Sequence, residues 1–456
     1  MDYYLWMSTL ERMSTATSEP SRRSHDREIL ALAVPAFGAL VAEPLFLMAD
    51  SAIVGHLGTP QLAGVGVASA ALTTATGVFV FLAYATTAAV ARRIGAGDRR
   101  GAVQQGVDGL WLALGLAVPV VLLTLLLAPW AAGVLGASPT AAPYTVTYLR
   151  ISSLGIPAML LVLAATGVLR GLQDTRTPLV VAVAGFTANI GLNAGLVYGA
   201  GLGVAGSAWG TVLAQTGMAA VYLVVVVRGA RREQASLRPD PAGIRAGARA
   251  GGPLLVRTVS LRAVLMIATA VAARLGDDQV AAHQITMTLF SFLAFALDAI
   301  AIAGQAVIGR YLGASDVPGT RAATRRMVEW GVGSGVVLGL LVVLARPLYV
   351  PLFTPDPVVQ GQLHTALLLL ALSQPAAGLV FVLDGVLMGA GDGPYLARAA
   401  LATLAVFTPA AFAVPATGTG LAGLWWAMDL FMLVRAVFLV ARARGGRWLV
   451  TGAVRS

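Results

Sequence analysis

The chain has 456 residues, of which 57% are hydrophobic and 11% charged, and its mean hydropathy is +0.80. Soluble domains carry about 25% charged residues, so this composition excludes an ordinary soluble protein and predicts an integral membrane protein. Cysteine is absent, which excludes disulfides, thiolate metal sites and a cysteine nucleophile.

Apolar segments long enough to cross a bilayer, which takes about 20 residues as a helix, recur along the whole chain. They cover residues 29–55, 61–91, 103–133, 141–168, 177–199, 203–228, 248–275, 280–311, 319–346, 358–388, 393–414 and 420–442. The sequence therefore predicts an all-α integral membrane protein with twelve transmembrane helices.

The basic residues show how these helices are oriented. All 31 are arginine, the net charge is +10, and they gather in the tails and in every second connection, as at Arg92 and Arg93 or Arg325 and Arg326. This alternation is the positive-inside pattern. It predicts a multi-pass protein of the plasma membrane, the inner membrane of a bacterial cell, with both termini cytoplasmic. It also explains the charge without nucleic acid as a partner.

The longest polar connection separates the spans into two sets of six and is rich in arginine and proline. We predict a polar cytoplasmic tail over residues 1–26, an N-terminal six-helix bundle over 27–228 and a cytoplasmic linker over 229–247. A C-terminal six-helix bundle over 248–442 and a cytoplasmic tail over 443–456 follow. The first residues do not resemble a secretory signal, because acids precede the bases and no long apolar core is present.

An internal repeat relates the two halves. A shift of 218 residues aligns Pro35 with Pro253, Asp98 with Asp316, and Asp174 with Asp392. Each half has an even number of spans, so the two repeats enter the membrane in the same sense and are parallel. Transporters with such repeats bind substrate between the halves.

Two acids lie within the first span, where an ionised carboxylate costs several kcal/mol. Asp50 and Glu43 are seven residues apart, two helical turns, and share one face of the helix. Asp50 is the first candidate for a functional group; Glu43 could equally form a structural pair or lie at the membrane surface. At the shifted positions stand Ala268 and Leu261, so this polar site belongs to the first half alone.

The second half has its own intramembrane acids. Asp298 lies well inside a span, and Arg257 or Arg262 on the seventh helix could neutralise it. A buried structural ion pair and a secondary role in coupling both remain open for Asp298 and Arg257. Asp384 and Asp429 are read as structural.

Several segments resemble one transporter family. LMADSAIVGHLG, YLRISSLGIP, RGLQDTRTPL and the double six-helix repeat are similar to the multidrug and toxic compound extrusion transporters. AEPLFLMAD, VAAHQI and ALDAIAIAGQ are most similar to its DinF-type branch, and the resemblance runs from Arg27 to about Arg442. It implies a cation-coupling site in the N-terminal bundle. The matching positions here are Asp50, Tyr148, Asn189 and Thr211, and Pro35 matches the family's helix bend.

This chain departs from the family at one position of the fifth span. The family motif ends in an acid, whereas NIGLN ends in Asn193. Asn189 and Asn193 are four residues apart, so both amides can face one cavity. Tyr148 and Thr211 add hydroxyl groups that can donate to a carboxylate.

We therefore expect a secondary active exporter of amphipathic, often cationic small molecules, working as a monomer by alternating access between two lobes. With Asp50 as the one clear carboxylate of the N-terminal site, protons are favoured over sodium as the coupling ion. The alternative is a flippase of a lipid-linked precursor in the same superfamily. No enzyme activity, cofactor or metal site is expected, because the four histidines are scattered and no acids cluster with them.

Overall fold

The computed structural model describes residues 22–455, and every regular element in that part of the chain is a helix. The elements are α2 (Arg22–Gly55), α3 (Thr59–Val78), α4 (Phe81–Gly95), α5 (Arg99–Val134), α6 (Ala142–Ser153), α7 (Ile156–Gly171), α8 (Arg176–Ala194), η1 (Gly195–Gly199), α9 (Gly203–Arg232), α10 (Pro241–Ala272), α11 (Asp277–Gly313), α12 (Val317–Phe353), α13 (Pro357–Gly389), α14 (Gly393–Thr417), α15 (Gly420–Arg444) and η2 (Gly446–Trp448). Most of the predicted N-terminal tail, residues 1–21, lies outside the described residues.

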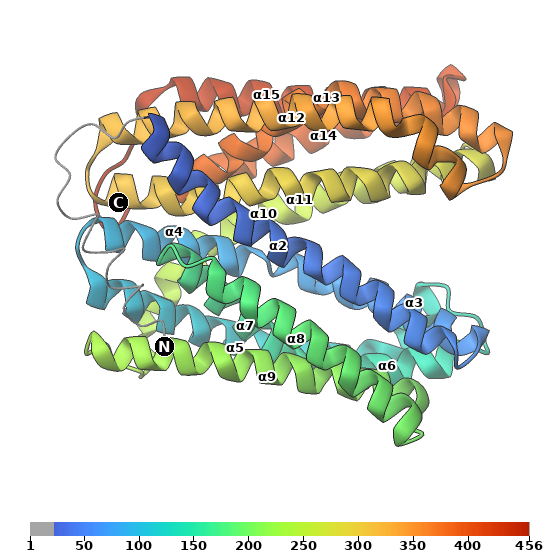
Figure 1. Cartoon of the computed structure of the whole chain (residues 1–456), viewed down its shortest axis with the longest axis horizontal. Helices are drawn as coiled ribbons and strands as arrows, with labels where there is room; N and C mark the ends of the chain where they lie inside the picture. Colours follow the sequence, from blue (N-terminus) through green and yellow to red (C-terminus); the bar gives the residue numbers. More distant parts are fainter. Residues whose placement is uncertain (1–21, 456) are drawn as a thin grey trace.

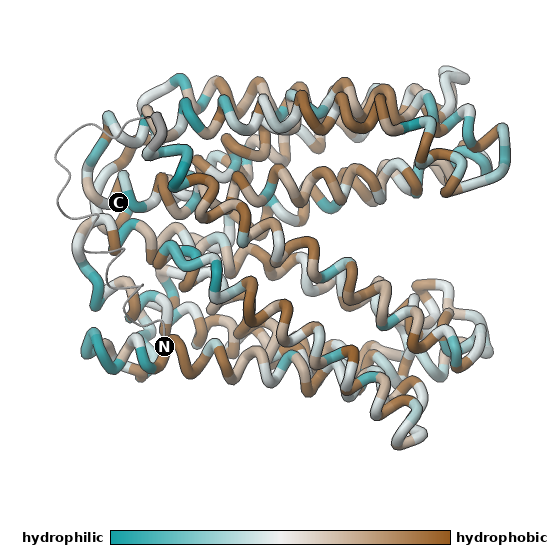
Figure 2. Tube along the Cα trace, in the orientation of Figure 1, coloured by the Kyte–Doolittle hydropathy of each residue, from teal (hydrophilic) through white to brown (hydrophobic). Residues whose placement is uncertain are grey.

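Eleven helical segments of the described chain are long and apolar enough to cross a membrane. The pair α6 and α7, bent by 52° at a short break, supplies a twelfth. One of the eleven, Thr59–Gly95, joins α3 and α4 across a break at Phe79 and Val80. Figure 2 shows hydrophobic residues along the middle of the helices and hydrophilic residues toward their ends. The predicted all-α membrane protein with twelve spans is confirmed.

The helices form two lobes, α2 to α9 and α10 to α15. Figure 1 shows the ribbons of the lobes close together where α4 ends and α5 begins, and diverging toward the opposite end. The first of these ends carries Arg92, Arg93, Arg99 and Arg100, and we name it the arginine-rich end. The lobes are thus joined at one end of their helices.

Two glycines let the lobes approach each other closely at the arginine-rich end. Gly95 on α4 lies so near the backbone of Arg310 on α11 that a side chain there would collide with it. Gly313 on α11 lies in the same way against the backbone of Arg92 on α4. The repeat relates the two contacts, since a shift of 218 residues takes Gly95 to Gly313 and Arg92 to Arg310. The crossing of α4 and α11 therefore lies on the pseudo-symmetry axis.

The same two arginines also make polar contacts across the lobes. Arg92 donates from Nη1 to the backbone oxygen of Ala390 in the second lobe, at 3.2 Å. Arg310 donates to Oε1 of Gln173 in the first lobe at 3.1 Å and forms an ion pair with Glu28 of α2. Each lobe therefore reaches a turn of the other through equivalent side chains.

Helix α2 bridges the lobes. It packs against α8 of its own lobe and α11 of the other, and it runs unbroken through Pro35 and Pro44. Near its start, Asp26 accepts hydrogen bonds from Nε of Arg326 at 2.6 Å and from Nε1 of Trp330 at 2.8 Å, both on α12. The beginning of α2 is thereby fixed to the second lobe, while the rest of the helix is part of the first lobe.

The segments predicted as the linker and the C-terminal tail contain regular structure and contacts with the lobes. Helices α9 and α10 extend into the predicted linker 229–247 and leave only residues 233–240 between them. The segment after α15, predicted as a tail from residue 443, folds back onto both lobes. Trp448 is buried, Arg92 donates from Nη2 to the backbone oxygen of Val450 at 2.6 Å, and the amide of Gly452 donates to the oxygen of Leu312 at 3.0 Å.

Candidate functional site

Asp50 lies in the interior of the first lobe, with 4% of its surface exposed. Its Oδ1 accepts two hydrogen bonds, one from Nδ2 of Asn193 on α8 at 2.5 Å and one from Oγ of Ser207 on α9 at 2.9 Å. Three helices therefore meet at this carboxylate. The structure brings Asp50 and Asn193 together, as the sequence proposed.

No arginine neutralises Asp50 within the part of the chain that the structure describes. Its nearest polar groups are the two neutral donors, Asn193 and Ser207, and no ion pair joins it to a basic side chain. A buried carboxylate without a partner charge pays a desolvation cost that nothing in its surroundings offsets. This feature distinguishes Asp50 from a structural ion pair.

Unused acceptors and hydroxyl groups lie on the helices that meet at Asp50. The amide oxygens of Asn189 and Asn193 are buried and receive no hydrogen bond from the described residues, and of the two amides only that of Asn193 contacts Asp50. Tyr148 is also buried and lies within electrostatic range of Asp50, with the hydroxyl of Thr211 beside its own. The Thr211 hydroxyl itself donates to the backbone oxygen of Ser207 at 3.1 Å. All five predicted coupling residues thus come from α2, α6, α8 and α9 of the first lobe.

Ser207 is a site residue that the sequence analysis missed. It precedes Thr211 by one helical turn on α9 and therefore shares its face. The repeat could have identified it, because GVAGSAW aligns with GLAGLWW and Leu424 is the residue equivalent to Ser207. Like Asp50, Ser207 is polar in the first half only.

Gly210 on α9 makes room for Asn193. A methyl group at Gly210 would collide with the side-chain oxygen of Asn193, whose Cγ would lie 3.0 Å from the new carbon. We expect Gly210→Ala to displace Asn193, break its hydrogen bond to Asp50 and cost about 1–3 kcal/mol by overpacking. The variant should lose most gradient-driven export when reconstituted at matched protein amounts.

Gly217→Ala is the matched control, since a methyl group at Gly217 on the same helix meets nothing within 4 Å. This variant should export at the parent rate. Equal export by the two variants would show that Asn193 need not hold its place beside Asp50.

Glu43 does not join the Asp50 site. It is exposed, and the charge that acts on it belongs to Arg262 on α10 of the other lobe. The guanidinium of Arg262 lies against Gly77 on α3, with its Cζ 3.0 Å from where a methyl group at Gly77 would be. Glu43 and Arg262 therefore face the space between the lobes. Sharing a helical face with Asp50 did not place Glu43 in the same pocket.

Arg257 pairs with a different acid from the one proposed. Its Nη2 donates to Oδ2 of Asp384 on α13 at 2.7 Å, and Arg435 on α15 forms a second ion pair with the same oxygen. Asp298 on α11 makes no ion pair with a described residue; it feels the charges of Arg170 and Arg257 at longer range. The buried ion pair of the second lobe is thus a triad around Asp384.

The described residues contain no group of three or more histidine, cysteine, aspartate or glutamate side chains that could hold a metal ion. The polar arrangement in the first lobe consists of one carboxylate, amides and hydroxyls. Such a set can bind and release a monovalent cation.

The family model described as MatE matches this chain twice, over residues 35–194 and 253–412. The two matches begin and end 218 residues apart, which is the shift of the internal repeat. Each half of the chain therefore matches the same family model, as the internal repeat predicts.

Similar proteins cover nearly the whole chain. Protein DETOXIFICATION 44, chloroplastic, from Arabidopsis thaliana is 31% identical over 92% of this chain and 83% of its own length. DNA damage-inducible protein F from Escherichia coli (strain K12) is 30% identical over 93% of this chain and 94% of its own length. The Vibrio cholerae MATE transporter VcmN in its bent form has the same fold, with a TM-score of 0.85 at 22% identity over 94% of this chain and 98% of its own. The chain belongs to the MatE family, whose members are membrane transporters and not enzymes.

Proposed function

We propose that this transporter is a proton-driven exporter in which Asp50 is the coupling carboxylate. The observation that carries the proposal is a buried acid that receives hydrogen bonds from neutral donors only. Protonation removes a charge that the surrounding helices do not compensate. The ion gradient can therefore change the energy of the first lobe by loading or emptying one side chain.

Helix α2 connects this chemistry to the lobes. Asp50 lies near its far end, while Asp26 and Glu28 near its start bind Arg326 and Arg310 of the second lobe. A change in the packing of α2 at Asp50 thus bears on the contacts that close the arginine-rich end. A helix that contains two prolines can change its curvature at low cost.

The arginine-rich end is the cytoplasmic end in this proposal, following the positive-inside rule. Both termini are then cytoplasmic, and the lobes are closed toward the cytoplasm. The arrangement corresponds to a carrier open to the outside, the state in which substrate leaves and the coupling proton enters.

The proposed substrates are amphipathic small molecules, often cationic, that bind between the lobes. Glu43 supports a cationic group there, because its carboxylate is exposed and makes no ion pair with a described residue. Relatives that the chain resembles include the probable multidrug resistance protein NorM of Thermotoga maritima, at 25% identity. We propose that the exporter works as a monomer.

The competing function is a flippase for a lipid-linked precursor, and one observation favours it. Arg262 is exposed between the lobes, where a pyrophosphate could meet its guanidinium group. We favour the exporter because Glu43 lies within electrostatic range of Arg262 and offsets its charge.

Transport by the purified protein in proteoliposomes tests the proposal. A cationic fluorescent dye should accumulate inside the vesicles when an imposed gradient drives protons out of them. A sodium gradient alone should have little effect. Transport driven by sodium alone would mean that sodium, and not the proton, is the coupling ion. The unused oxygens of Asn189 and Asn193 would then be additional ligands. Movement of a fluorescent lipid pyrophosphate without dye transport would support the flippase instead.

A further inference from the structure

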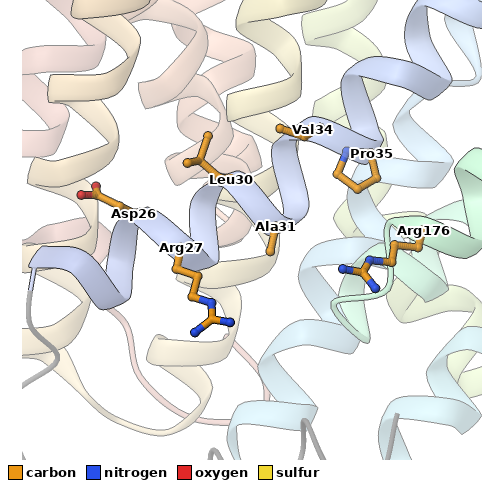
Figure 3. Close-up of a pocket in the computed structure, with 7 residues that line it drawn as sticks. All are labelled: Asp26, Arg27, Leu30, Ala31, Val34, Pro35 and Arg176. Atoms are coloured by element: carbon orange, nitrogen blue, oxygen red, sulfur yellow. The ribbon is translucent and has the colours of Figure 1, made fainter. Parts of the chain in front are cut away.

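A pocket of about 580 Å³ opens between the starts of α2 and α8 at the arginine-rich end. It is lined by Asp26, Arg27, Leu30, Ala31, Val34, Pro35 and Arg176. Figure 3 shows Arg27 and Arg176 extending into one gap, the first from α2 and the second from α8. This pocket lies at the start of α2, whereas Asp50 lies near the end of that helix, and the transport scheme gives the pocket no ligand.

The charged side chains of the pocket that have no partner among the described residues are both positive. Arg27 and Arg176 are exposed, and neither side chain has a hydrogen-bond acceptor or an ion pair among the described residues. The one acid in the lining, Asp26, is already bound by Arg326 at 2.6 Å. Nearby Asp174 accepts from the backbone amides of Arg176 and Thr177, at 3.1 and 2.9 Å. Both carboxylates are thus occupied, and both guanidinium groups are available.

The rest of the lining is apolar and exposed. Val34 is 62% exposed and Leu30, one turn earlier, 41%, while Ala31 and Pro35 continue the surface beside them. These residues belong to a membrane-spanning helix, so the apolar wall runs from the arginines toward the middle of the bilayer. A ligand that fits has an anionic group at the membrane surface and a hydrocarbon chain below it.

We propose that this pocket binds an anionic phospholipid of the adjacent leaflet, with its phosphate between Arg27 and Arg176 and an acyl chain along Leu30 and Val34. A free phosphate would satisfy the arginines but leave the apolar wall exposed. Paired guanidinium groups are well suited to phosphate oxygens.

Such a lipid would join two helices of the first lobe, one of which is fixed to the second lobe. The start of α2 is fixed to the second lobe through Asp26 and Arg326, whereas Arg176 begins α8 of the first lobe. A lipid held by Arg27 and Arg176 would therefore favour the arrangement in which the arginine-rich end is closed. Membrane composition would then affect how often the carrier adopts this state.

Native mass spectrometry of the full chain, released from nanodiscs or detergent with titrated lipid, tests the proposal. Phosphatidylglycerol should bind in preference to phosphatidylcholine, and Arg27→Gln with Arg176→Gln should reduce that preference roughly tenfold or more. Val34→Asn should weaken both lipids, because it places a polar group in the acyl contact.

The control is Arg100→Gln with Arg321→Gln, which removes two exposed arginines that do not line the pocket and should leave the preference unchanged. An equal loss in the control would overturn the proposal in favour of general surface charge. Displacement of the lipid by millimolar inorganic phosphate would reveal a plain anion site. Equal binding of both lipids by the parent would leave an apolar groove only. These results do not depend on whether Asp50 couples transport to protons.

Discussion

Replacement of Asp50 by asparagine is expected to abolish gradient-driven export while leaving substrate binding and membrane insertion intact. Both donors, Asn193 and Ser207, bind the same carboxylate oxygen, so the amide oxygen of asparagine can keep both hydrogen bonds. What the variant loses is the ability to change charge. Coupling free energies of about 1–3 kcal/mol correspond to rate or affinity changes of roughly 5–150-fold. The export rate should therefore decrease by at least a factor in this range.

The measurement is dye export by the parent and the variant in the same proteoliposomes, together with equilibrium binding of the dye. Asp298→Asn is the matched comparison, because Asp298 is also an intramembrane acid without a described ion pair. It should retain more export than Asp50→Asn. Normal export by Asp50→Asn combined with loss in Asp298→Asn would move the coupling site to the second lobe.

The spans and the repeat could be predicted because they depend on one-dimensional properties. Twenty apolar residues between polar connections suffice to define a membrane helix, whatever its neighbours. The repeat is a constant offset between equivalent residues, such as Pro35 and Pro253, and can be found by aligning the sequence with itself. Both predictions can be made without information on which side of a helix faces which partner.

The partners of buried charges required the three-dimensional structure. Arg257 could have met Asp298 or Asp384, since both acids lie in spans, and only the three-dimensional structure shows that it pairs with Asp384. Glu43 shares a helical face with Asp50, yet over two turns that face passes from the interior of the first lobe to the space between the lobes. Helix periodicity gives the direction of a side chain on its own helix, not the helix that it meets.

The contacts of the polar connections could not be predicted for a related reason. Composition indicated a linker and a C-terminal tail but not which of their residues find buried partners. Trp448 is the buried residue of the segment after α15, and Arg92 donates a hydrogen bond to the backbone oxygen of Val450. A single tryptophan in a basic segment was the available signal.

Gly95→Ala and Gly313→Ala are each expected to open the arginine-rich end. A methyl group at either glycine would collide with the backbone of the opposite lobe, at Arg310 or Arg92, and backbone cannot move aside as a flexible side chain can. Overpacking of this kind costs about 1–3 kcal/mol, and here the whole cost falls on the state in which α4 and α11 cross. The population of the closed arrangement should drop roughly 5–150-fold relative to the open one.

Spin labels at Arg100 and Arg321 measure this change, because both residues are exposed, lie on different lobes and can be replaced by cysteine in a chain that has none. The distance distribution between the labels should shift to longer values in both glycine variants and stay at the parent position in Gly115→Ala, where a methyl group meets nothing within 4 Å. The repeat makes the test stricter, since it relates the two contacts. A shift in one variant only would mean that the crossing is not shared equally by the lobes, and unchanged distances in both would show that other contacts, such as those of Asp26 and Glu28, keep this end closed.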